Sequence, residues 1–270
     1  NELITWHFDH TFGRSVKGVN ILSGLYHNQE VTVPISFQPI KKTEKVVDPK
    51  TGRERRKSLK TKNEYLRDMA KVATFDNRIK YRWIVADVWF SSNDNMEYIK
   101  FDLKKEFVMP VKTNRLIASS KNEAKKGQFK QVELCQIEQD QPQVVYLKEI
   151  PFAVLLLKQT FKNEDGGEGI LYLVCSDLTA SIDQIKTVYQ KRWHVEEYHK
   201  SLKSNLALSK SPTKTVVTQS NHFFASIYSF FKLEMLKVRH NLNHFALKTK
   251  LYMQALKASM IELEKLRLAT

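Results

Sequence analysis

Apolar residues near the start of the chain are gathered in short runs that favour strands. β-branched and aromatic side chains dominate these runs, and polar residues separate them. The expected strands lie at residues 4–9, 19–26 and 31–37. The polar residues 27–29 predict a hairpin turn. Residues 41–62 break the pattern, because Lys, Arg and Glu dominate them. We expect a mobile loop there, serving either as a solvated surface or as a DNA contact.

The next part of the chain alternates between helical and extended patterns. Apolar side chains recur at helical spacing in residues 64–75, and a second helix is expected to start at a serine cap and to end near Leu103. The apolar run 82–86 predicts a short strand of the buried kind, and residues 106–111 predict another strand. Alternation of this kind predicts an α/β domain, with a mixed sheet flanked by helices.

Residues 114–176 carry a different pattern, with several β-like runs and few helical ones. The expected strands lie at residues 128–137, 144–147, 152–160 and 169–175. From Ser181 onward the spacing is helical. We therefore expect three segments: a core at 1–113, a β-rich insertion at 114–176, and a helical segment at 177–270 that completes the core.

The charge balance narrows the class of partner. The chain has 44 Lys and Arg against 29 Asp and Glu, a formal net charge of +15, which favours nucleic acid over an anionic membrane surface. The apolar stretch 223–236 is interrupted by charges and is too short to span a bilayer, so no membrane partner is expected. Cys135 and Cys175 form no metal-binding or disulfide pattern. The chain also lacks a phosphate-binding glycine loop, which disfavours a nucleotide cofactor.

One helical segment carries the most informative chemistry. On an ideal helix of about 100° per residue, four polar side chains point within about 60° of one another. They are Tyr189, Arg192, Glu196 and Lys203. Glu197 projects about 100° away from Glu196 and cannot play the same part. The simpler alternative is a surface helix with an ordinary Arg192–Glu196 ion pair, worth about 0.2–0.5 kcal/mol.

Phosphoryl transfer needs more than one carboxylate, because two divalent cations about 3.5–4 Å apart share the work. Two aspartates stand at predicted strand ends, Asp9 after the first strand and Asp87 after the buried strand 82–86. For each alone, a turn-forming role is the simpler interpretation. His7 and His10 point to opposite strand faces, which disfavours a shared zinc ion but leaves a supporting role near Asp9 open.

The spacing Y-x2-R-x3-E-x6-K on this helix resembles the signature of the insertion-sequence family 4 transposases, and so do the segments 6–11, 86–90 and 189–193. The resemblance covers essentially the whole chain. It implies a ribonuclease-H-like α/β core with a DDE triad of Asp9, Asp87 and Glu196. It also implies two Mg²⁺ ions held by these residues, with Mn²⁺ as a substitute.

The same resemblance implies DNA as the partner, both as transposon ends and as target. Tyr189, Arg192 and Lys203 would hold end DNA, and Trp193 is expected either to stack on an unpaired base or to serve as a core or interface residue. Further basic side chains of this region are expected at the DNA, namely Lys200, Lys210 and Lys214. For Lys210 and Lys214, a solvated surface is an equal alternative.

The resemblance further implies strand cleavage and strand transfer, a hairpin intermediate, a homodimer in the synaptic complex, and a bacterial protein in the cytoplasm near the nucleoid. Members of the family usually carry an N-terminal DNA-binding region, and we expect that region to be missing from this chain. Two alternatives stay open: a DNA-binding remnant without catalysis, and a ribonuclease-H-like nuclease.

Overall fold

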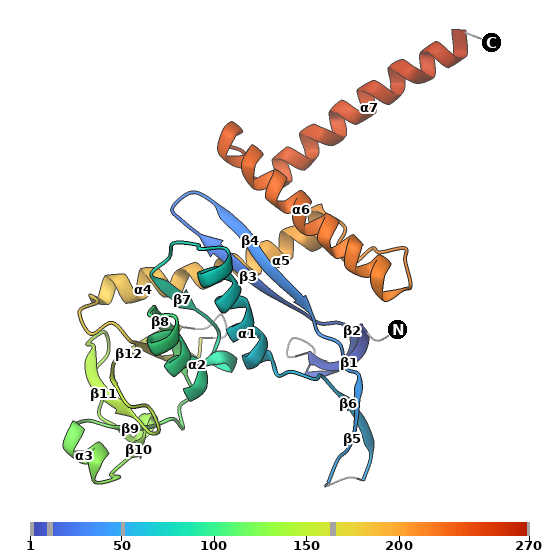
Figure 1. Ribbon diagram of the computed structural model, residues 1–270. Helices are drawn as coiled ribbons and strands as arrows, with labels where there is room; N and C mark the ends of the chain where they lie inside the picture. The colour runs from blue at the N-terminus through green and yellow to red at the C-terminus, as the bar shows by residue number, and fades with distance from the viewer. Residues whose placement is uncertain (1–2, 10–12, 50–51, 163–165, 269–270) are drawn as a thin grey trace. The chain divides into compact units, whose positions relative to one another are not determined.

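The computed structural model describes residues 3–9, 13–49, 52–162 and 166–268, and the side chains of residues 8 and 9 also lie outside the description. The chain divides into two compact units (Figure 1). Unit 1 comprises residues 1–59 and 194–270, and unit 2 comprises residues 60–193. Both contain strands and helices, so the predicted mixed α/β class is confirmed.

Unit 2 is built on a seven-stranded mixed sheet with the order β10-β9-β11-β12-β13-β8-β7. β7 runs parallel to β8, and the other neighbours are antiparallel. The strands are β7 (Trp83–Val85), β8 (Glu106–Val111), β9 (Leu116–Ala118), β10 (Lys130–Gln131), β11 (Gln143–Leu147), β12 (Ala153–Lys162) and β13 (Glu168–Cys175).

The predicted strands of unit 2 are mostly confirmed. The run 106–111 matches β8, and those at 82–86, 144–147, 152–160 and 169–175 each contain or overlap a strand. The prediction for 128–137 was largely wrong, because β10 holds only two residues and a 3-10 turn at Val132–Leu134 follows. Segment 114–176 joins the same sheet as β7 and β8. The division at residues 113 and 176 stays a prediction.

The helices of unit 2 begin at polar caps, as the sequence leads one to expect. The Thr61 hydroxyl accepts the Glu64 amide, and the Glu64 carboxylate accepts the Thr61 amide, which forms a capping box for α1. Ser92 caps α2, and Ser181 caps α4. The helices are α1 (Lys62–Lys71), α2 (Asn93–Glu97), α3 (Lys121–Lys125) and α4 (Ile182–Gln190), and π-helical turns extend α1 to Asp76 and α2 to Asp102.

The sheet of unit 2 is buried on both faces, which explains its continuous apolar runs. Along β12, Val154 and Leu156 join one apolar cluster, which includes residues of α2. Leu155 and Leu157 join the opposite cluster, in which Ile185 of α4 packs. Because successive strand residues point to opposite faces, this alternation fixes the register of the strand.

Within its described residues, unit 1 has three two-stranded antiparallel ribbons and three helices. The ribbons are β1 (Ile4–Asp9) with β2 (Arg14–Val19), β3 (Ile21–His27) with β4 (Thr32–Pro39), and β5 (Glu44–Val47) with β6 (Glu54–Lys57). The helices are α5 (His194–Asn205), α6 (Val216–His240) and α7 (His244–Leu268). β1 agrees with its prediction at both ends, β3 and β4 confirm the predicted hairpin, and β2 was not predicted as a separate strand.

The loop predicted at 41–62 was wrong, since β5 and β6 form a hairpin there. Gly52 near its turn has a φ of +65°, a backbone conformation in which glycine avoids strain. Glu44 faces Lys57 across the ribbon, whereas Lys45 faces the like-charged Arg56. The prediction failed because it required apolar side chains, whereas this ribbon has a backbone ladder between mainly charged side chains.

Unit 1 combines a small apolar cluster with a buried polar network. Tyr198 and Leu202 of α5 pack with Ile227 and Phe230 of α6. Beside them, the buried Glu234 of α6 accepts hydrogen bonds from Lys237 at 3.0 Å and from the Thr32 amide at 3.2 Å. His244 Nε2 lies 3.1 Å from Glu234 Oε1, and His244 Nδ1 lies 2.9 Å from the Ser201 hydroxyl. The network ties α5, α6, α7 and β4 together.

Candidate active site

Asp87 stands where the sequence predicts it, directly beyond β7. Its Oδ1 accepts the Val88 amide at 2.5 Å, and it caps a 3-10 turn at Val88–Phe90. The turn-forming role is thus present. The carboxylate is nevertheless exposed, and the Val88 amide is its one hydrogen-bond donor within the described residues. Asp87 therefore keeps oxygen lone pairs available for a hard cation such as Mg²⁺.

Asp9 is the last residue of β1, where its backbone pairs with Arg14 of β2. Its side chain lies outside the described residues. The nearby His7 is described, and its Nδ1 lies 3.3 Å from the Thr5 carbonyl oxygen. His10 lies outside the described residues, so its relation to His7 stays a prediction.

Tyr189 and Arg192 are neighbours in unit 2. Tyr189 lies in the last turn of α4 and packs against the apolar cluster on that face of the sheet. The Arg192 guanidinium carbon lies 5.8 Å from the centroid of the Tyr189 ring, within the range of a cation–π contact. Trp193 follows in a 3-10 turn and is 57% exposed, which argues against its assignment as a core residue within unit 2.

Glu196 and Lys203 belong to α5 in unit 1. Glu196 lies in the first turn, and both side chains are exposed. The adjacent Glu197 accepts a hydrogen bond from His194 Nδ1 at 2.7 Å. On α5, Glu196 and Lys203 are seven residues apart and point in directions about 20° apart. They share one face of this helix.

A single uninterrupted helix from Tyr189 to Lys203 was assumed above, and that assumption was wrong. α4 ends at Gln190, a 3-10 turn occupies Lys191–Trp193, and α5 begins at His194. A 3-10 turn advances by about 120° per residue, so the 100° projection holds only within each α-helix. Tyr189 with Arg192 and Glu196 with Lys203 are therefore two separately supported pairs.

The remaining predicted DNA contacts are all exposed lysines in unit 1. Lys200 lies on α5. Lys210 and Lys214 lie in the loop between α5 and α6, where the Lys210 amide donates to the Ala207 carbonyl at 2.9 Å. Lys203 also acts on its neighbour His199: burial lowers the pKa of His199, and the positive charge of Lys203 lowers it further.

The described residues contain no group of three or more His, Cys, Asp or Glu side chains placed to hold a metal ion. The predicted triad could not form such a group, because the Asp9 side chain is outside the description and Asp87 and Glu196 belong to different units. Carboxylates are the donors that Mg²⁺ prefers, so the residue types fit the ion. Their assignment as metal ligands stays a prediction.

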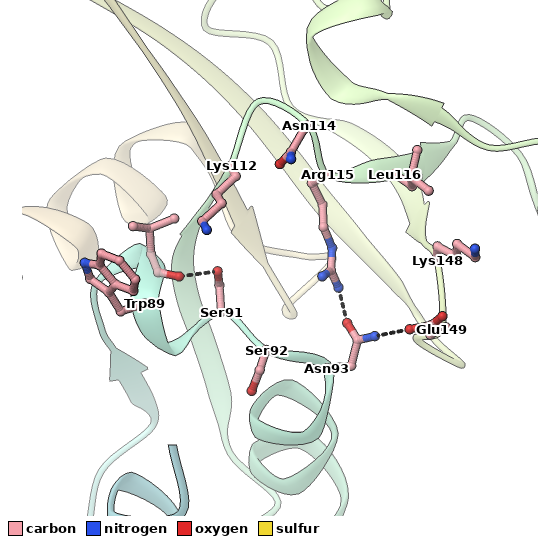
Figure 2. A pocket seen from close by; sticks show the side chains of 11 residues that line it. Trp89, Ser91, Ser92, Asn93, Lys112, Asn114, Arg115, Leu116, Lys148 and Glu149 are labelled. Atoms are coloured by element: carbon pink, nitrogen blue, oxygen red, sulfur yellow. Dashed lines mark hydrogen bonds between the residues drawn. The ribbon is translucent and has the colours of Figure 1, made fainter. Parts of the chain in front are cut away.

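Sequence reasoning missed a hollow that begins at the residue after Asp87. The hollow has a volume of about 450 Å³. Its basic lining residues come from two separate segments of the chain, and Figure 2 shows their side chains around the hollow. Those residues are Lys112, Arg115 and Lys148. The available signal was the cluster of polar and basic residues directly after the predicted strand 106–111.

In the described part of the chain, no helix combines the length and the apolar character needed to cross a lipid bilayer.

Comparison with known proteins places the chain in a family. No curated protein matches the chain. A family model described as "Transposase DDE domain" matches residues 39–229, about seven tenths of the sequence, and this segment includes Asp87 and Glu196 but not Asp9. The chain therefore belongs to the transposase DDE domain family.

Proposed function

We propose that this chain cleaves phosphodiester bonds and transfers DNA strands at the ends of an insertion sequence, with Asp9, Asp87 and Glu196 as its acidic triad. The observation that carries the proposal is the family match over residues 39–229, because it spans two of the three acids. Asp87 supports it by standing exposed just beyond the half-buried strand β7, which runs parallel to β8. Glu196 supports it by standing exposed in the first turn of a helix.

We propose that the core is ribonuclease-H-like. The places of the three acids in their elements support this. β1 ends at Asp9, and Asp87 follows two residues after the last residue of β7. Glu196 lies in the first turn of α5.

Asp9, Asp87 and Glu196 would together hold two Mg²⁺ ions, or Mn²⁺ in their place. When bound, the ions would lower the pKa of the attacking water or 3′-hydroxyl and stabilise the leaving oxygen. Arg192 and Lys203 would neutralise DNA phosphates, and the Tyr189 hydroxyl would donate a hydrogen bond to one. The Arg192–Tyr189 contact supports this role, since it holds the guanidinium over a ring that is anchored in the core.

Further basic and aromatic side chains would extend the DNA contact along the chain. Their exposure supports this, because phosphates reach such side chains without unfolding the core. They are Trp193, Lys200, Lys210 and Lys214. We further propose a bacterial transposase of insertion-sequence family 4, working as a homodimer on paired ends through a hairpin intermediate and located in the cytoplasm at the nucleoid.

The test compares Asp87→Asn with the wild-type chain on duplex DNA that carries the transposon end. We expect Mg²⁺-dependent nicking by the wild type and a loss of at least about 100-fold in the variant, because one of the three proposed carboxylate ligands becomes a neutral amide. Asp76→Asn, at another exposed aspartate of unit 2, is the matched control and should retain nicking. Unchanged nicking by Asp87→Asn would exclude the triad.

Two other functions give different results in the same assay. A nuclease on this fold would nick DNA in a manner that depends on Asp87 but would never join the cut end to a target. A DNA-binding remnant would bind the end without nicking it at any Mg²⁺ or Mn²⁺ concentration. Joined products that require both Asp87 and a free 3′-hydroxyl support the transposase.

A further inference from the structure

The hollow beside Asp87 lies wholly within unit 2, so its geometry is set by one compact body. One wall is the turn Val88–Phe90 with the serines after it, and the opposite wall is the loop that follows β8 (Figure 2). It opens at the carboxyl ends of the parallel strands β7 and β8. In open α/β sheets, ligands bind in this position.

The lining of the hollow is built for an anion. Lys112, Arg115 and Lys148 supply three positive charges against the single carboxylate of Glu149. The Glu149 carboxylate already accepts a hydrogen bond from the Asn93 amide at 2.9 Å. Asn93 in turn accepts a hydrogen bond from Arg115, which fixes the guanidinium (Figure 2). An excess of two positive charges remains for an incoming group.

Arg115 carries the most specific signal. Its Nε is buried and has no hydrogen-bond partner in the described part of the chain. Burial also lowers the pKa of Arg115, while the nearby Glu149 charge acts in the opposite direction. A buried donor without a partner destabilises the fold, and a shift of the guanidinium toward a bound phosphate would let an oxygen atom satisfy it.

Trp89 adds an aromatic surface to this basic lining. Its side chain is 59% exposed although the residue lines the hollow. The Lys112 ammonium lies 5.5 Å from the centroid of the Trp89 ring. An exposed indole next to cationic side chains is the combination that binds single-stranded nucleic acid, since the ring stacks on a base while the cations hold the backbone.

From these contacts we infer that the hollow holds one unpaired nucleotide of a DNA strand, with its base on the Trp89 indole and its phosphate between Lys112 and Arg115. A volume of about 450 Å³ is in the range of small-ligand pockets and excludes a duplex. The inference rests on the proposed function, because it takes the ligand to be the DNA strand processed at Asp87.

The test measures binding of fluorescein-labelled duplexes by anisotropy in EDTA, so that no cleavage occurs. One duplex is blunt, and the other carries a three-nucleotide single-stranded extension with 2-aminopurine. For Trp89→Ala we expect roughly a 5- to 150-fold loss of affinity for the extended duplex, the range of one base–aromatic stack, and little change for the blunt one. Trp89→Phe should restore most of the affinity.

Two further readouts separate stacking from a general loss of structure. The 2-aminopurine fluorescence should be quenched by the wild type and not by Trp89→Ala. Lys112→Ala should lower the slope of log affinity against log salt by about 0.7, the value for one phosphate on a single strand. Lys126→Ala, an exposed lysine next to α3, is the matched control and should leave slope and quenching unchanged.

Different failures overturn different statements. Equal losses on blunt and extended duplexes, or quenching that survives in Trp89→Ala, would overturn the assignment of an unpaired nucleotide. Thymidine monophosphate or inorganic phosphate binding as tightly as the extended duplex would show a small-molecule site and overturn the assignment to a DNA strand. If Trp89 governs binding while wild-type protein never nicks DNA, the proposed function fails and the nucleotide site stands.

Discussion

The two units are stabilised by different means. Unit 2 places an apolar cluster on each face of one sheet, with Leu156 in one cluster and Leu157 in the other, both fully buried. Unit 1 relies on narrow ribbons, a small apolar cluster around Tyr198, and the charged network around Glu234. The comparison shows that Asp87 belongs to a unit that is stabilised mainly by apolar burial. Glu196 stands on a helix anchored partly by polar contacts.

The largest expected effect tests the apolar half of this comparison. Leu156→Ala removes a fully buried side chain from β12 and leaves a cavity between packed neighbours, so we expect a loss of roughly 2–5 kcal/mol in the free energy of unfolding. Urea denaturation followed by circular dichroism measures it. Leu256→Ala on α7, where the leucine is 55% exposed, is the matched control and should change stability by less than about 0.5 kcal/mol.

A change below about 1 kcal/mol in Leu156→Ala would mean that unit 2 is loosely packed and that its sheet does not hold Asp87 rigidly. Two-state analysis is valid only where units 1 and 2 unfold together. Fluorescence of Trp83 and Trp89, with the other tryptophans replaced, would report on unit 2 separately.

The second effect tests the polar half. Glu234→Gln keeps the shape of the side chain but removes the charge that Lys237 contacts. Because charged hydrogen bonds are lost, we expect the free energy of unfolding to decrease by roughly 1.5–3 kcal/mol. Burial alone would raise the pKa of Glu234, but His244, Lys237 and the Thr32 amide together hold it below its ordinary value of 4.5. The ionised Glu234 network therefore makes its full contribution to the free energy of unfolding above pH 4.5.

This contribution is lost as the pH falls below 4.5 through the lower pKa of folded Glu234. Wild type and Glu234→Gln should accordingly differ most in urea stability near neutral pH and converge in acid. Glu262→Gln, on the exposed part of α7, is the control and should follow the wild-type curve. A constant difference between the two proteins at every pH would mean that packing, and not ionisation, explains the cost.

The same contrast explains what the sequence could predict. The strands at 82–86 and 106–111 were predicted from their apolar runs, and Asp87 was placed at the end of the first of them. The β5–β6 hairpin was missed because charges line it. The basic hollow was missed because Trp89, Lys112 and Lys148 meet only after the sheet has formed. Pattern reasoning locates elements that apolar burial specifies, and polar arrangements require coordinates.

The candidate site also has a part that the sequence predicted and a part that it did not. Residue types and strand ends identified Asp87, and the structure places it on the surface with one hydrogen bond from Val88. The 3-10 turn at Lys191–Trp193 could not be foreseen, because its residues are compatible with an ordinary α-helix. Arg192 lies in that turn next to Tyr189 of α4, whereas Glu196 and Lys203 lie on α5, so the proposed DNA contacts do not share one helix.

The smallest expected effect concerns the exposed ribbon β5–β6. Lys45 Nζ lies 3.9 Å from Glu54 Oε2, and both side chains are about two-thirds exposed, so solvent screens the pair. Lys45→Ala should change the free energy of unfolding by at most about 0.5 kcal/mol, and less at 1 M salt. Thermal melts at low and high salt measure it. If the variant instead loses as much stability as Glu234→Gln, the ribbon is a structural part of unit 1. If it loses DNA affinity while its stability is unchanged, the charged ribbon serves DNA binding and does not contribute to the stability of unit 1.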